Sequence, residues 1–108
     1  MDFKITRVYS DSKDDTHFED LNIPLNKEGE ISFLSEAQKT NKLIFQKVMA
    51  TYNYDFHVAP ALQYIVLLHG EIEMEPSLGN KRIFSGEIVL LEDTTGKGHK
   101  NQISEYKS

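Results

Sequence analysis

The sequence predicts an all-β domain, either a sandwich or a barrel. Short runs of alternating or β-branched residues recur at close spacing, with turn residues between them. The only candidate helical turn, "SEAQKTN" at residues 35–41, is too short to form a helical layer. A parallel α/β architecture would need crossover helices, for which a chain of 108 residues with this pattern has no room.

The strands are expected one after another along the chain. The alternating run "FKITRVY" at residues 3–9 is the first, and Pro24 argues against a central strand in the mixed stretch after it. "PSLGN" at residues 76–80 has the composition of a hairpin loop. The remaining expected strands are residues 30–34, 42–52, 62–75, 81–86 and 87–92, followed by "KNQISEY" (residues 100–106) as loop or strand.

The stretch that follows His57 predicts how the domain packs. If His57 faces inward, alternation also turns inward Ala59, Ala61, Gln63, Ile65, Leu67 and His69. The opposite face, with Tyr64, Val66 and Leu68, is apolar as well. Because a strand that is apolar on both faces is covered on both, a second sheet or a partner subunit is expected there. We therefore expect a homodimer.

Composition and charge exclude several classes of protein. The chain has the size of one domain (residues 1–108, with a core at roughly 16–104), and 39% of its residues are hydrophobic. The net charge is -5 without a basic run, and no apolar stretch is long enough for a bilayer, so neither a nucleic-acid nor a membrane partner is expected. The N-terminal residues lack the apolar core of a signal peptide, which predicts a cytoplasmic protein.

The glycine-rich stretch "LLEDTTGKGHKN" (residues 90–101) superficially resembles a phosphate loop. A phosphate loop needs a hydroxyl residue after its lysine, but Lys97 is followed by Gly98. Leu91 stands where the first glycine belongs, and no amphipathic helix follows. The phosphate-loop interpretation therefore fails, and His99 is the informative residue.

Histidines at strand ends are the candidates for chemistry. The chain has no cysteine, so a metal ion would need nitrogen and oxygen ligands. His57 and His99 each border an apolar strand, and Gln63 is in phase with His57, so the three could hold a divalent ion with open positions. His69 is in phase too, but it lies about 20 Å along an extended strand from Gln63. The alternative is that both histidines are solvated or hydrogen-bonded without any metal.

Five further residues are candidates for a substrate pocket. Asp93 either caps a local turn or orients His99, and the alternating aromatic run before His57 either packs the rim or forms a wall for a substrate. Gln46 lies in an apolar expected strand and would need a hydrogen-bond partner if it faced inward. The five are Gln46, Tyr52, Tyr54, Phe56 and Asp93.

Two segments resemble the two sequence motifs of the cupin superfamily. They are "FHVAPALQYIVLLHGEIEME" (residues 56–75) and "GEIVLLEDTTGKGHKNQ" (residues 86–102). In the first, His57 takes the place of the first motif histidine, Gln63 that of the glutamate and Gly70 that of the closing glycine, whereas Ala59 replaces the second histidine. In the second, Gly86 matches and His99 arrives two residues late. "H-x-AP-x-x-Q" and "EDTTGKGH" resemble a group of small single-domain cupins, and the likeness covers roughly residues 16–102.

The resemblance implies a double-stranded β-helix, that is, a jelly-roll cupin barrel, with a pocket at its mouth. It carries metal binding onto His57, Gln63 and His99, with one divalent ion such as iron, manganese, nickel or zinc. His57 and His99 are then the catalytic residues of a dioxygenase-, isomerase- or decarboxylase-type enzyme acting on a small polar molecule. Two departures from the motif, Ala59 and Gln63, remove one ligand and neutralise another. A metal-free sensor or carrier that uses the same pocket, or a metal-free enzyme with a histidine base, therefore stays open.

Overall fold

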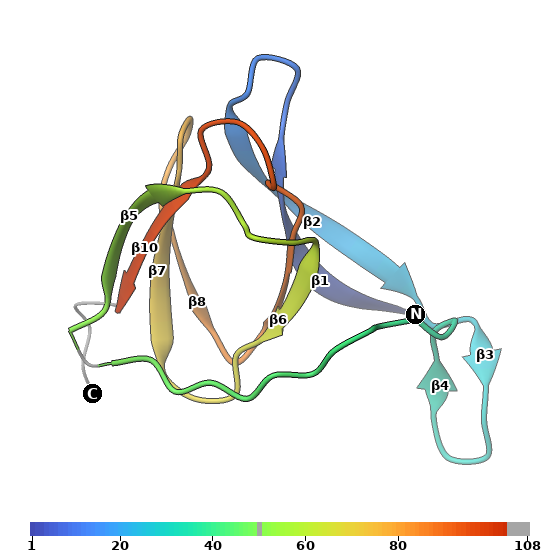
Figure 1. Ribbon diagram of the computed structural model, residues 1–108. Helices are drawn as coiled ribbons and strands as arrows, with labels where there is room; N and C mark the ends of the chain where they lie inside the picture. The colour runs from blue at the N-terminus through green and yellow to red at the C-terminus, as the bar shows by residue number, and fades with distance from the viewer. Residues whose placement is uncertain (50, 104–108) are drawn as a thin grey trace.

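The computed structural model of this chain describes residues 1–49 and 51–103, which contain ten β-strands and no helix (Figure 1). The all-β prediction is confirmed for these residues, and no helix among them could cross a membrane. The end of the expected tail strand, at residues 104–106, lies outside them. The strands are β1 (Asp2–Ser10), β2 (Thr16–Pro24), β3 (Lys27–Glu28), β4 (Phe33–Leu34), β5 (Asn53–His57), β6 (Gln63–Val66), β7 (Glu71–Pro76), β8 (Arg82–Ser85), β9 (Ile88–Leu91) and β10 (His99–Ile103).

The strands form two four-stranded sheets and a small separate ribbon. One sheet has the order β2-β1-β9-β6, the other β5-β10-β7-β8, and β3 pairs only with β4. Strand β1 pairs antiparallel with β2 and parallel with β9, where Thr6 lies opposite Val89. Among the described residues the pairing closes none of these sheets into a barrel.

The hydrophobic core lies between the two four-stranded sheets. Val8, Val89 and Leu91 come from the first sheet, and Met74 and Phe84 from the second. Because strand side chains alternate between faces, each sheet supplies every second residue to this core. The two sheets therefore hold β5 and β10, which carry the two candidate histidines, against a packed interior.

Several expected strands are confirmed. The run at residues 3–9 lies within β1, and the expected hairpin loop joins the antiparallel strands β7 and β8. Pro24 ends β2, which is an edge strand, in agreement with its inability to donate to a ladder. The expected strand at residues 62–75 is two strands, because Gly70 takes a φ of 86° and turns the chain between β6 and β7.

Two expectations for the middle of the chain are wrong. Residues 35–41 form no helical turn, and residues 42–49 form no strand, although position 50 is not described. The apolar pattern "LIFQKVM" suits a strand, but no strand edge within the described chain pairs with it, and a strand needs such a partner.

The inward alternation after His57 holds only in part. Ala59 is buried, and Ile65 and Leu67 pack on the core, whereas Ala61 and His69 are exposed. The opposite side of β6 is open in this single chain, because Tyr64, Val66 and Leu68 are exposed. The described residues of one chain therefore do not supply the second cover expected for this strand.

Candidate functional site

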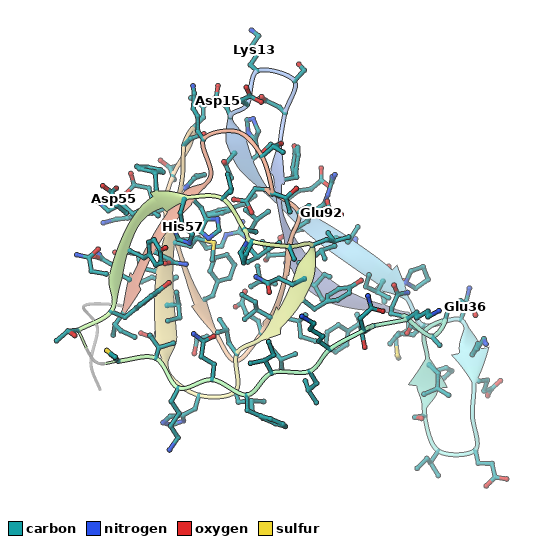
Figure 2. All side chains as sticks on the ribbon, viewed as in Figure 1. Lys13, Asp15, Glu36, Asp55, His57 and Glu92 are labelled. Atoms are coloured by element: carbon teal, nitrogen blue, oxygen red, sulfur yellow. The ribbon has the colours of Figure 1, made fainter. Side chains whose placement is uncertain are left out.

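His57 and His99 meet at the top of the second sheet. His57 ends β5 and His99 begins β10, and the antiparallel register places their Cα atoms opposite each other. The two ring centroids are 4.7 Å apart with planes inclined at 56°. His57 points from β5 towards the inside of the fold (Figure 2). His99 is buried and His57 half-buried, so access to the pair is from the His57 side.

Gly98 allows this close approach. Its φ is 73°, and a Cβ atom at this position would lie 2.0 Å from the carbonyl oxygen of His57. A side chain cannot be accommodated there without moving one of the two strands. The glycine directly before His99 thus sets the distance between the two histidines.

A buried hydrogen bond fixes the orientation of His99. Asp93 is fully buried, and its Oδ2 accepts a hydrogen bond from Nδ1 of His99 at 2.5 Å. The backbone carbonyl of Asp93 accepts from the amide of Ala59 at 3.0 Å, which ties the end of β9 to the chain just after His57. Of the two roles predicted for Asp93, its side chain performs the orienting one.

The hydrogen bonds determine which ring nitrogens remain available. Nδ1 of His57 contacts the carbonyl oxygen of Asp55 at 2.8 Å, and since a carbonyl only accepts, this nitrogen carries the proton. Nδ1 of His99 is likewise the donor to the Asp93 carboxylate. In the neutral form of each imidazole, Nε2 therefore keeps its lone pair, which can bind a metal ion or accept a proton.

Aromatic side chains line the approach to His57. The ring of Tyr54 stacks on His57 with centroids 3.9 Å apart, and Tyr52 contacts Tyr54 edge-on at 6.3 Å. The hydroxyl of Tyr52 donates to Oδ1 of Asn101 at 2.5 Å, and burial raises the pKa of Tyr52. Phe56 is exposed and makes no ring contact with either histidine among the described residues. Tyr54 is thus the member of the predicted aromatic run that contacts His57, and Tyr52 packs against Tyr54.

Asn101 was not among the predicted site residues. It follows His99 by two positions in β10, so both belong to the same face of the strand. That periodicity, together with an amide side chain, was the signal that could have identified it.

The two predicted glutamines are placed differently. Gln63 is half-buried at the start of β6, opposite Leu91, and within the described chain it makes no hydrogen bond to either imidazole. Gln46 is exposed on the connection between β4 and β5. Gln46 was expected in the pocket because a strand in this segment could turn its side chain inward, but residues 42–49 form no strand.

Lys97 lies in the turn before His99 and binds the loop between β1 and β2. Its Nζ lies 2.9 Å from Oδ1 of Asp15 in the loop between β1 and β2, the loop labelled at Lys13 and Asp15 in Figure 2. The hydrogen bond between them raises the pKa of Lys97 and lowers that of Asp15. The carbonyl of Gly98 also accepts from Thr16 Oγ1 at 2.5 Å. These contacts anchor the turn. The role of Lys97 is thus to hold the turn, in place of the phosphate binding that a phosphate loop would require.

Two further observations bear on ligands. No group of three or more histidine, aspartate or glutamate side chains that could share a metal ion occurs within residues 1–49 and 51–103. A polar depression of about 180 Å³ lies beside β7 and β10, and neither His57 nor His99 lines it. Its lining residues are Glu73, Glu75, Lys81, Lys100, Asn101 and Gln102.

Comparison with known proteins gives no match. No protein-family model, no curated protein and no solved structure is significantly similar to this chain.

Proposed function

We propose that this chain is a small cupin-type protein that binds a small polar molecule at the His57–His99 pair and uses one divalent metal ion there. The observation that carries the proposal is the state of the two imidazoles. Their ring centroids lie 4.7 Å apart, and each donates its Nδ1 proton to a fixed acceptor, so both Nε2 lone pairs remain available as far as the described residues are concerned. Histidines that bind metals are held by the same kind of bond, to a carboxylate or a backbone carbonyl.

Two side chains among the described residues are suited to be ligands of such an ion. Nε2 of His57 and Nε2 of His99 are the nitrogen donors, and Oε1 of Gln63 is the proposed oxygen donor. A divalent ion in this place would supply Lewis acidity and open positions for a substrate.

Asp93 supplies a negative charge near the site, which the neutral Gln63 does not. The family motif has a glutamate where this chain has neutral Gln63, which leaves a bound ion with one negative charge less. The Asp93 carboxylate is fully buried, and its Oδ1 has no hydrogen-bond partner among the described residues. A positive charge on or beside His99 would stabilise this carboxylate, because a buried charge without a counter-charge is costly.

The pocket residues favour a small substrate with polar groups. Tyr54 presents a ring against His57, and Tyr52 and Asn101 form a polar pair beside it. A planar or cyclic molecule could stack on Tyr54 while its polar atoms face the histidines. On the resemblance to cupins, the proposed class is a cytoplasmic enzyme of the dioxygenase, isomerase or decarboxylase type, with His57 and His99 as its catalytic residues.

Metal analysis of protein purified without a histidine tag tests this proposal. We expect about one divalent ion per chain after incubation with iron, manganese, nickel or zinc, and its loss in both His57→Ala and His99→Ala. His69→Ala is the matched control, because His69 is exposed in the turn after β6 and should leave the metal content unchanged. A protein that takes up none of the four metals would contradict the proposal.

Gln63→Glu tests the third ligand. Restoring a carboxylate should raise metal affinity by about tenfold or more, since an anionic oxygen is a better donor to a divalent ion than a neutral amide. Unchanged affinity in a correctly folded variant would remove Gln63 from the ligand set while leaving the two histidines in it.

A metal-free site is the second candidate function. It is favoured by the absence, in the described part of the chain, of a group of three or more histidine, aspartate or glutamate side chains placed to share a metal ion. In that case His99, oriented by Asp93, is a general base or a hydrogen-bonding group for the ligand. Thermal-shift screening of metal-stripped protein against small polar compounds distinguishes the two, because only the metal-free site would keep its ligands in the presence of a chelator.

A further inference from the structure

The connection between β4 and β5 contains a strand-like segment with an unpaired backbone. We call residues 42–49 the open segment. Within the described chain, its backbone takes part in one backbone hydrogen bond, from the amide of Tyr52 to the carbonyl of Met49. Its large apolar side chains are exposed to an unusual degree, with Leu43 at 80%, Ile44 at 78%, Phe45 at 86% and Met49 at 79%. Exposed apolar side chains beside free backbone groups are the features of a strand that lacks its neighbour.

Strand β6 offers the matching edge. It is the last strand of the sheet β2-β1-β9-β6, so one of its two sides has no neighbouring strand. The residues along its outer face are apolar and exposed, with Leu62 at 66%, Val66 at 57% and Leu68 at 84%. Between them, the hydroxyl of Tyr64 donates to Gln38 at 3.3 Å, so the connection of the same chain runs past this strand (Figure 1).

The exposed area is large enough for a stable interface. Burying a large apolar side chain removes about 100 Å² from water, so the seven side chains named above represent about 700 Å². A standard protein interface buries about 800 Å² on each partner. The open segment and the face of β6 together therefore approach what a specific dimer requires.

Charge on the two elements is complementary. Lys39, Lys42 and Lys47 lie in or next to the open segment, which contains no acid. Glu87 lies beside the end of β6, where the amide of Leu67 donates to its carbonyl, and Glu71 begins β7 after the turn that follows β6. In the described structure none of these five side chains has an ion-pair partner. The open segment is thus basic, and the charged residue beside the end of β6, Glu87, has the opposite sign.

We infer that two copies of this chain form a two-fold dimer in which the open segment of one copy pairs along β6 of the other. Both complementary elements are present on every copy, so a symmetric dimer satisfies each of them twice. Strand addition at a sheet edge supplies the backbone hydrogen bonds, and the apolar residues of the two elements cover one another. This interface does not depend on whether the histidine pair binds a metal.

Sedimentation of the purified full chain tests the inference. At a concentration on the order of 100 µM, well above the Kd of most standard-size interfaces, the protein should have twice the 12.4 kDa of one chain. Phe45→Asp in the open segment and Val66→Asp on β6 should each shift it to the monomer. Both side chains are exposed in the single chain, so the variants should keep the circular dichroism of the folded protein.

Ile31→Asp is the matched control. Ile31 is 97% exposed, but it lies between β3 and β4, outside both elements, and its replacement should leave the dimer intact. Hydrogen exchange should show amides of residues 43–49 that are protected in the dimer and become unprotected on dilution. A monomeric wild type, or a Phe45→Asp variant that stays dimeric, would overturn the inference. So would protection of these amides in the dilute monomer, because the segment would then pair within its own chain.

Discussion

Gly98 and the carbonyl group of His57 touch across the junction of β10 and β5 so closely that a Cβ atom on Gly98 would lie 2.0 Å from the carbonyl oxygen. The contact falls one residue before His99, opposite the end of β5. The spacing of the two imidazoles is therefore determined by backbone packing, independently of any ligand. It makes Gly98 a structural requirement of the site.

Replacing Gly98 by alanine should destabilise the fold and disturb the histidine pair. The left-handed φ of 73° costs alanine about 1 kcal/mol, and the overlap with His57 adds to that cost because the atoms that it would meet are backbone atoms. We expect the free energy of unfolding to fall by about 3 kcal/mol in urea titrations.

Gly70→Ala provides the comparison for that variant. Gly70 has a similar φ of 86°, but nothing lies within 4 Å of the position its Cβ would take. Alanine there should cost only the backbone strain, about 1 kcal/mol. Equal losses of stability in the two variants would show that the approach of Gly98 to His57 is not as close as described.

Asp93→Asn tests the bond that orients His99. Asparagine keeps the size of the side chain and can still accept from Nδ1, but it removes the negative charge. If the site binds zinc, its affinity should fall by about 10–100-fold, the usual effect of losing a group that supports a metal-binding histidine. Calorimetric titration with zinc measures this change directly.

Asp11→Asn is the appropriate control for the loss of charge. Asp11 Oδ2 also contacts a histidine, His17, at 2.6 Å, but Asp11 lies in the loop after β1 and His17 in β2, so this pair includes neither His57 nor His99. Its replacement should leave zinc affinity unchanged. An equal effect of both substitutions would indicate general electrostatics and not orientation of His99.

The ion pair between Lys97 and Asp15 predicts a dependence of stability on pH. Since the pKa of Asp15 is lowered below its ordinary 3.8, the contribution of the pair is present above that pH and is lost as the pH falls through the lower folded value. The pKa of Lys97 is raised above 10.5, so at alkaline pH the contribution is lost only when the pH rises beyond that value. Lys97→Met should therefore destabilise the protein at pH 7 but have little effect in strong acid.

Thermal unfolding at neutral and acidic pH, with and without salt, measures this difference. Salt should weaken the effect at pH 7, because the pair is exposed on the Lys97 side. Lys13→Met serves as a control, since Lys13 lies in the same loop as Asp15 and has no ion-pair partner among the described residues. A Lys97→Met effect that persists unchanged in acid would exclude the ion pair as its cause.

Local sequence patterns predicted the elements whose partners the chain itself supplies. Alternation identified β1, and turn composition identified the hairpin of β7 and β8. The same reasoning selected His57 and His99 from four histidines, and the structure brings these two together. Strand ends next to turn residues are informative because such residues gather at one edge of a sheet.

The local sequence pattern did not predict the state of the open segment or the roles of Asp55 and Gly98. The sequence of the open segment is that of a strand, but whether it becomes one depends on an edge elsewhere, which periodicity does not reveal. The roles of Asp55 and Gly98 could not be read either. Asp55 acts on His57 through its backbone carbonyl, and Gly98 acts by lacking a side chain.

The parallel pairing of β1 with β9 has a consequence for biosynthesis. Because β1 is an inner strand of its sheet, one of its two sides stays unsatisfied until residues 88–91 have left the ribosome. Contacts between such distant parts of a chain form slowly, and the exposed edge of β1 is vulnerable to aggregation during that time. His57 likewise has no His99 beside it until residue 99 has left the ribosome, so a nascent chain forms the histidine pair only after all of β9 has been made.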